Sequence, residues 1–154
     1  PNLTNINASE LIDAALKVLD SKINEKKIEV NKIGWKDSVL LSADPDLMEQ
    51  AIYGLLANAV DATPNSTILE ISIINIGNTL EIHIQDSGSG LPFEPKPGNL
   101  EPGPSTKRFG TGLGIPIAFK ICQKHNWHLD FNTIKGKGTK VIITAPINPE
   151  KELS

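Results

Sequence analysis

Residues 86–114 read DSGSGLPFEPKPGNLEPGPSTKRFGTGLG, and the rest of the chain is organised around this stretch. A glycine-rich turn opens it, a proline-rich segment follows, and a second glycine-rich turn leads into a predicted helix. Two such turns on either side of a polar segment favour a loop that closes over a phosphate-bearing ligand. We expect the preceding segments to build half of a pocket and the following ones to complete a sheet behind it.

The second glycine-rich turn has the features of a phosphate cradle. Its sequence, GTGLG at 110–114, precedes a helix predicted over 115–124, so backbone amides at a helix N-terminus can approach an anion. Lys107 and Arg108 stand just before the turn and either bind phosphate or form a solvated pair. The turn does not directly follow a strand, which excludes the dinucleotide-fold interpretation of such glycines.

The segment between the two turns, Pro92 to Pro104, contains five prolines and two glycines without any periodicity. Such a composition excludes a helix or an inner strand. Pro92 and Pro95 have the spacing of a proline-rich docking motif, but we favour a lid.

A hairpin is predicted immediately before this stretch. Its strands, at 69–73 and 80–84, alternate apolar and polar residues on either side of a Gly77-Asn78 turn. Asp86 is in phase with the apolar positions of the second strand, so we expect its carboxylate on the core side of the sheet.

Two interpretations of Asp86 remain open. It can accept hydrogen bonds from the amides of Ser87 and Gly88, as turn aspartates commonly do. It can also contact a ligand, which Gly88 and Gly90 would allow to approach the backbone closely. An unpaired buried carboxylate is costly, so Asp86 needs donors in either case, and the two glycines lead us to favour the ligand contact.

A helix from Asp44 to about Ala62 starts with a cap residue followed by proline at the first helical position. At about 100° per residue, Gly54, Asn58 and Asp61 fall within an arc of about 60° beside the apolar face. Asn58 is therefore either a boundary amide that caps a neighbouring backbone group or a ligand-binding residue.

The remaining segments predict an α/β fold. Residues 7–26 have helical spacing of apolar side chains behind the cap residue Asn7. Short strands are predicted at 27–33 and 39–42, and a final hairpin pairs 128–132 with 140–146.

Composition limits the classes of function. The 154 residues suit one compact domain, residues 1–154, and no apolar run approaches the roughly 20 residues of a membrane span. The net charge of −3 argues against nucleic-acid binding, so an anion would be held by local donors. Because the chain begins at Pro1 and not at Met, we expect a fragment of a larger protein, whose parent can be membrane-anchored.

The thiol and imidazole groups favour structural roles. Cys122, the only cysteine, fits a reducing compartment and is interpreted as a buried thiol, since no flanking base suggests a nucleophile. His83, His125 and His128 do not form a spacing that predicts a metal cage of side chains. No Ser/His/Asp order is recognisable.

Four motifs together resemble one family, the catalytic ATP-binding domain of sensor histidine kinases, within the superfamily that includes gyrase-type and Hsp90-type ATPases. DPDLMEQAIYGLLANAVDAT resembles the family's N box, DSGSG its G1 box, and STKRFGTGLGI the end of its ATP lid with the G2 box. HNWHLDFNTIKGKGTKVIITAP is similar to its closing segment. Each motif alone is weak, but all four occur in the family's order over nearly the whole chain.

The resemblance implies a fold and an activity. The fold would be a two-layer α/β sandwich of the Bergerat type, with a mixed five-stranded sheet, about three helices on one face and an ATP lid. The domain would bind Mg-ATP and donate its γ-phosphoryl group to a histidine on a partner dimerisation domain, as a histidine protein kinase of a two-component system. No segment resembles that dimerisation domain, so the acceptor is expected upstream in the parent chain.

The resemblance also implies roles for individual residues. Asn58 would hold the Mg²⁺ that bridges the phosphates, and Asp86 would accept from the adenine amino group. Thr139 would support the adenine beside Asp86, directly or through water, and Gly88 and Gly90 would shape the floor. The lid and G2 positions would bind the phosphates, with Lys107 or Arg108 on the terminal one: Thr106, Lys107, Arg108, Gly110, Thr111, Gly112, Leu113 and Gly114.

The sequence departs from the family pattern at several positions. Gly54 replaces the glutamate with which gyrase-type ATPases activate water, so the domain should be a poor ATPase alone. Asp61 stands where many kinases have a lysine, and an acid there would weaken nucleotide binding unless it turns outward. Asn126-Trp127 replaces a common Gly-Gly in a turn. The lid keeps Phe93 and Phe109 but lacks the family's usual second aromatic in its phenylalanine-rich box.

The expected partners are ATP or ADP, the histidine-bearing dimerisation domain and a response regulator, in the cytoplasm, with the isolated domain a monomer. Two alternatives stay open. One is a nucleotide-sensing or docking module without competent transfer, and the other is a serine kinase of the anti-sigma type from the same superfamily.

Overall fold

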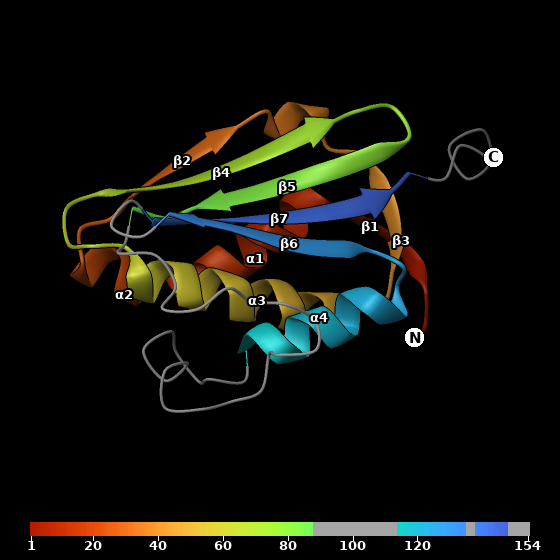
Figure 1. Ribbon diagram of the computed structural model, residues 1–154, viewed down its shortest axis with the longest axis horizontal. Helices are drawn as coiled ribbons and strands as arrows, with labels where there is room; N and C mark the ends of the chain where they lie inside the picture. Colours follow the sequence, from red (N-terminus) through yellow and green to blue (C-terminus); the bar gives the residue numbers. More distant parts are fainter. Residues whose placement is uncertain (88–113, 135–137, 148–154) are drawn as a thin grey trace.

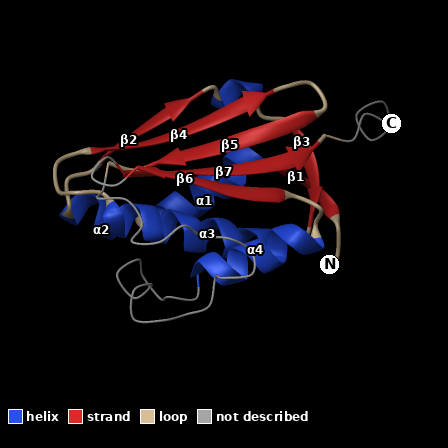
Figure 2. Ribbon diagram, viewed as in Figure 1, coloured by secondary structure: helices blue, strands red, loops and turns tan. Residues whose placement is uncertain are grey.

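The computed structural model describes residues 1–87, 114–134 and 138–147, which form a layer of strands and a layer of helices (Figure 1). Helices α1 (Ala8–Val18), α3 (Pro45–Ala62) and α4 (Gly114–Lys124) lie together on one face of the main sheet. The short α2 (Asp20–Glu25) lies at one end of this helix layer (Figure 2). The predicted two-layer α/β sandwich with three main helices on one face is confirmed.

The main sheet is mixed and has five strands in the order β2-β4-β5-β7-β6. Neighbours β2 and β4 run parallel, and every other neighbouring pair is antiparallel. The two hairpins predicted from alternation are therefore present, β4 with β5 and β6 with β7. The strands are β2 (Glu29–Ile33), β4 (Ile68–Asn75), β5 (Thr79–Gln85), β6 (His128–Ile134) and β7 (Gly138–Pro146).

A second, two-stranded sheet joins β1 (Thr4–Asn7) to β3 (Leu40–Ala43) in antiparallel register. The strand expected at 39–42 corresponds to β3, but it pairs outside the main sheet. Strand β1 was not predicted, because the four residues TNIN carry no alternation of apolar and polar side chains.

The helix predicted over 7–26 is wrong in one respect, since it is divided at Leu19. Asn7 caps α1 as expected, its side chain accepting from the Ser9 N–H at 3.0 Å. Leu19 then leaves the helical region, at φ −89° and ψ 2°, before α2 begins. Leu16, Leu19 and Ile23 are buried on either side of the break, so the apolar periodicity continues through it and conceals it.

The start of α3 is tied to the end of α4. The Asp44 carboxylate caps α3 by accepting from the N–H groups of Asp46 and Leu47, at 3.1 and 3.2 Å. Its pKa lies below 3.8, first because the Asn2 N–H also donates to it, at 2.8 Å. The backbone N–H of Asp44 donates to Nε2 of the buried His125 at 3.0 Å. These bonds position the two helices that border the site described below.

The core lies between the sheet and the helices. Register places Ile71 opposite Ile84 and Ile73 opposite Ile82, and Ile82 in turn faces Ile143 of β7. These side chains are almost wholly buried against the helix layer. Because side chains alternate along a strand, Asp86 continues the buried row of β5, with 6% of its surface exposed. The predicted core-side position of Asp86 is confirmed.

None of the helices in the described ranges combines the length and the apolar character needed to span a membrane.

Candidate functional site

Three residues that the sequence singled out meet at one small pocket: Asn58 of α3, Asp86 at the end of β5 and Thr139 of β7. The free space between the lining side chains is about 20 Å³, which is room for about one water molecule. The polar groups therefore lie close together in an otherwise apolar setting. The apolar lining consists of Leu55, Ala59, Ala62, Ile115, Phe131 and Val141.

Asp86 is held by the backbone of Thr139. Its N–H donates to the Thr139 carbonyl oxygen at 3.0 Å, and its Oδ1 accepts from the Thr139 N–H at 3.1 Å. The Gln85 side chain donates to the Asp86 carbonyl oxygen at 3.0 Å. Two strands thus fix both the backbone and the carboxylate of Asp86, which is the kind of preorganisation that recognition of a polar ligand requires.

Gly138 is a site residue that the sequence interpretation missed. Its φ is +101°, and a Cβ added there would lie 2.4 Å from the Asp86 carbonyl oxygen and 3.1 Å from its Oδ1. Glycine is therefore needed both for the backbone conformation and for the close approach of β7 to Asp86. The signal was present as the Gly-Lys-Gly-Thr of residues 136–139, but spacing alone did not show which glycine faces the carboxylate.

Asn58 is half-buried at the wall of the pocket. Within the part of the chain that the structure describes, its amide makes no hydrogen bond to another residue. The alternative interpretation, a boundary amide that caps neighbouring backbone, is therefore not what the structure shows. An unengaged amide oxygen beside a buried carboxylate is suited to a hard cation or to a polar ligand.

The N-terminus of α4 borders the same pocket. Gly114 is its first residue, and Ile115 lines the pocket with 6% of its surface exposed. The positive end of the helix dipole therefore lies at the site. The other predicted phosphate and floor residues lie outside the described residues, and their roles stay predictions: Gly88, Gly90, Thr106, Lys107, Arg108, Gly110, Thr111, Gly112 and Leu113.

Asp61, which was expected to disfavour nucleotide binding unless it turned outward, pairs with α2. Its carboxylate lies 2.5 Å from Lys22 Nζ, and this contact raises the pKa of Lys22. Lys26 Nζ donates to the carbonyl oxygens of Val60 and Asp61 at 2.6 and 3.0 Å, and burial lowers the pKa of Lys26. The two lysines thus offset the charge of Asp61 and cap the end of α3.

The Asn126-Trp127 departure is accommodated by the turn after α4. Asn126 adopts φ +58°, a conformation that asparagine tolerates better than most residues. Trp127 is buried at 4% exposure and makes an edge contact with His125, with ring centroids 5.9 Å apart. His125 Nδ1 lies 2.8 Å from the Ile121 carbonyl oxygen, so Nδ1 carries the proton and Nε2 accepts from Asp44.

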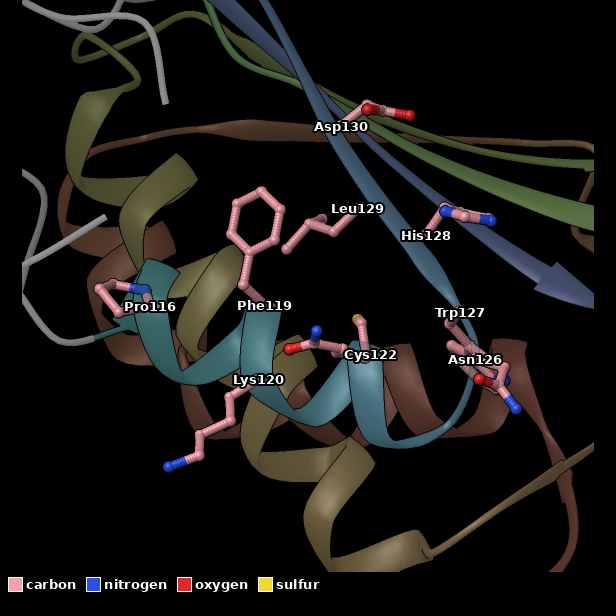
Figure 3. A pocket seen from close by; sticks show the side chains of 10 residues that line it. Pro116, Phe119, Lys120, Cys122, Asn126, Trp127, His128, Leu129 and Asp130 are labelled. Carbon is pink, nitrogen blue, oxygen red and sulfur yellow. The ribbon is translucent and has the colours of Figure 1, made fainter. Parts of the chain in front are cut away.

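A second and larger hollow lies between α4 and the edge strand β6, with a volume of about 490 Å³ (Figure 3). Phe119 and Leu129 point toward one another across it, whereas Lys120 points away. Its buried thiol, Cys122, has a pKa raised by burial to about 12 and is therefore unreactive at neutral pH. Of the predicted site residues within the described ranges, none lines this hollow. In the described ranges, no three His, Cys, Asp or Glu side chains gather to hold a metal ion.

Comparison with known proteins assigns the family. Residues 43–149 match the family model of the histidine kinase-, DNA gyrase B- and HSP90-like ATPases. The chain belongs to this ATPase family. The resemblance inferred from the four motifs is thereby confirmed, and the small pocket is lined by three of the residues to which the resemblance assigns a role.

The similar proteins reported below are named as kinases. The chain is 28% identical to sporulation kinase A of Bacillus subtilis over 141 residues, which make up 92% of this chain and 23% of that protein. It thus spans less than a quarter of that relative. The nucleotide-free catalytic domain of the histidine kinase ThkA is 26% identical, covers 98% of this chain and superposes with a TM-score of 0.83. Another ThkA structure, in complex with the response regulator TrrA, has a TM-score of 0.77 at 24% identity over 97% of this chain and 43% of that one.

Proposed function

We propose that this chain is the ATP-binding catalytic domain of a sensor histidine kinase, which binds Mg-ATP and donates the γ-phosphoryl group to a histidine of a dimerisation domain. The observation that carries the proposal is the pairing of Asp86 with Thr139 at a pocket that also holds the unengaged Asn58 amide. Membership of the ATPase family supports nucleotide as the ligand.

The site residues would bind different parts of the Mg-nucleotide. Asp86, an acceptor fixed on the core side, fits the exocyclic amino group of adenine, and Thr139 would support the same base. Asn58 would provide an oxygen ligand to Mg²⁺, which when bound would neutralise phosphate charge. The amides at the start of α4, with Lys107 or Arg108 and the glycines before it, would hold the phosphates.

In the transfer itself, a nitrogen of the acceptor imidazole would attack the γ-phosphorus. The bond to the bridging oxygen breaks, and ADP leaves with the electron pair. The chain's own contribution is to hold the donor in line and to neutralise charge, which is the main requirement in phosphoryl transfer. Because Gly54 offers no general base one turn before Asn58, the domain would hydrolyse ATP poorly without an acceptor.

The phosphate would then pass from histidine to an aspartate of a response regulator, and the assembly of ThkA with TrrA supports a partner of this kind. The acidic Asp61 was one reason to consider a sensing module without competent transfer. This reason is weakened, since Asp61 is paired with Lys22 and its charge is offset.

The test is transfer of label from γ-labelled ATP to a supplied acceptor domain. Asn58→Ala should reduce labelling to background, because the chain would no longer provide this oxygen ligand to Mg²⁺. Asn65→Ala, at an exposed position just beyond α3, is the matched control and should label like the unsubstituted chain. Unchanged labelling in Asn58→Ala would contradict the role of Asn58. ATP binding without labelling in any variant would favour a sensing module.

A further inference from the structure

Thr133 contacts the nucleotide-site residue Thr139 from the neighbouring strand. The two threonines are directly paired in the β6–β7 register, and their hydroxyl oxygens lie 3.1 Å apart, with Thr139 donating to Thr133. Leu129, Phe131 and Thr133 alternate along β6, so Thr133 shares the helix-facing side with Phe131, which lines the pocket. A polar side chain thus extends the polar end of the pocket into β6.

Thr139 is consequently held by its side chain as well as by its backbone, whose carbonyl oxygen also accepts from the Asp86 N–H. Its N–H is fixed on Asp86 Oδ1, and its hydroxyl is fixed on Thr133, while only 4% of its surface is exposed. A hydroxyl carries one hydrogen and can also accept, and its hydrogen rotates to suit its partners. The oxygen positions therefore permit either direction of donation between the two threonines. That direction decides whether Thr139 presents a hydrogen or a lone pair to the pocket.

The direction matters because purine bases differ at two neighbouring positions. Adenine presents an amino donor beside the ring acceptor N1. Hypoxanthine and guanine present a carbonyl acceptor beside an N1–H donor. An ionised Asp86 can only accept, so it suits the amino group. The ring N1 of adenine then needs a donor nearby, directly or through one water. Thr139 can supply that donor when its own oxygen accepts from Thr133.

We propose that Thr133 is a positioning residue for base selection. In the nucleotide complex it donates to Thr139, so that the Thr139 hydroxyl in turn donates to adenine. This arrangement favours adenine over hypoxanthine and guanine. The inference rests on the proposed function, because it assumes that this pocket holds the base. It adds a residue to which the family resemblance assigns no role. Thr133 acts through Thr139 and does not need to touch the nucleotide.

The experiment measures dissociation constants for ATP and for ITP, whose base is hypoxanthine, by calorimetry with Mg²⁺ present. Thr133→Val keeps the shape of the side chain and removes the hydroxyl. It should weaken ATP binding about fivefold, as expected for one lost hydrogen bond, and leave ITP binding unchanged or tighter. Thr133→Ser restores the hydroxyl and should return both constants to the original values. Thr144→Val removes a β7 hydroxyl from a half-buried position on the opposite face of the sheet and should change neither.

The inference would be overturned if the ratio of the ATP and ITP dissociation constants were the same in Thr133→Val and in the unsubstituted chain, whether both affinities fall or neither does. Equal losses would mean that Thr133 only supports the fold. If the unsubstituted chain binds no ATP, the proposed function itself fails, and this inference fails with it.

Discussion

Residues of helix α4 line two hollows that differ in size and in chemistry. The one toward β7 has a free volume of about 20 Å³, and the one toward the edge strand β6 has about 490 Å³. The small one contains a fixed carboxylate, a buried threonine and an unengaged amide. The large one contains a buried thiol whose pKa is about 12 and the side of a structural tryptophan. The comparison favours the small pocket as the functional site, because backbone groups hold its carboxylate in place. Volume alone would favour the other hollow.

The largest expected effect follows from Gly138→Ala. The added methyl group would collide with the Asp86 carbonyl oxygen at a backbone conformation that L-residues rarely adopt, so Asp86 must move. We expect ATP binding to fall by at least about a hundredfold, and stability to fall by roughly 2–3 kcal/mol. Calorimetric titration and thermal unfolding measure the two effects.

Gly77→Ala is the matched control for this substitution. Gly77 also has a positive φ, +105°, but an added Cβ would meet nothing within 4 Å. The Gly77→Ala variant should therefore lose stability through backbone strain alone and bind ATP with the affinity of the unsubstituted chain. Equal ATP affinities in Gly138→Ala and Gly77→Ala would remove the evidence that the approach of β7 to Asp86 serves the site.

Trp127→Ala tests the large hollow. Trp127 is 4% exposed, so its truncation should cost about 3 kcal/mol of unfolding free energy. The ATP dissociation constant of the folded variant should stay within about twofold of the original value, because Trp127 does not line the small pocket. Chemical denaturation gives the first quantity and titration at low temperature gives the second. A selective loss of ATP affinity in a stable, folded variant would show that the large hollow also contributes to binding.

The smallest effect concerns the carboxylate of Asp44, which caps α3. The pKa of Asp44 is lowered in the folded state, first by the Asn2 N–H, so its charge stabilises the fold above about pH 3.8. This stabilisation is lost as the pH falls through the lowered folded-state value. Asp44→Asn keeps a good cap without the charge. Its deficit in unfolding free energy should therefore be full at pH 7 and shrink as the pH falls through the lowered folded-state pKa of Asp44. A deficit that does not change with pH would contradict the assignment.

Features that depend on neighbouring residues could be predicted from the sequence. The cap and proline at Asp44-Pro45 located α3, and the period of two along β5 put Asp86 on the core side. Features that depend on distant pairing could not. The strand β1 exists because it pairs with β3, more than thirty residues away, and its own four residues give no pattern. The direction of Asp61 depends on Lys22 of another helix.

The candidate site likewise combines features that the sequence could predict with features that depend on distant contacts. Asn58, Asp86 and Thr139 could be chosen from motifs, but the need for glycine at 138 depends on how closely β7 approaches Asp86. Thr133 has no distinctive sequence environment, and its proposed role depends on its register with Thr139. The break at Leu19 was hidden because buried residues keep helical spacing across it.

The most direct test of the account is calorimetric titration of the unsubstituted chain and of Asp86→Asn with ATP and Mg²⁺. The asparagine can still accept from the Thr139 N–H through its side-chain oxygen, so the local backbone pairing should survive while the charge is lost. We predict clear binding by the original chain and a loss of at least about a hundredfold in the variant, with thermal stability nearly unchanged. Equal ATP affinity in the two proteins would contradict the claim that this small pocket reads the base.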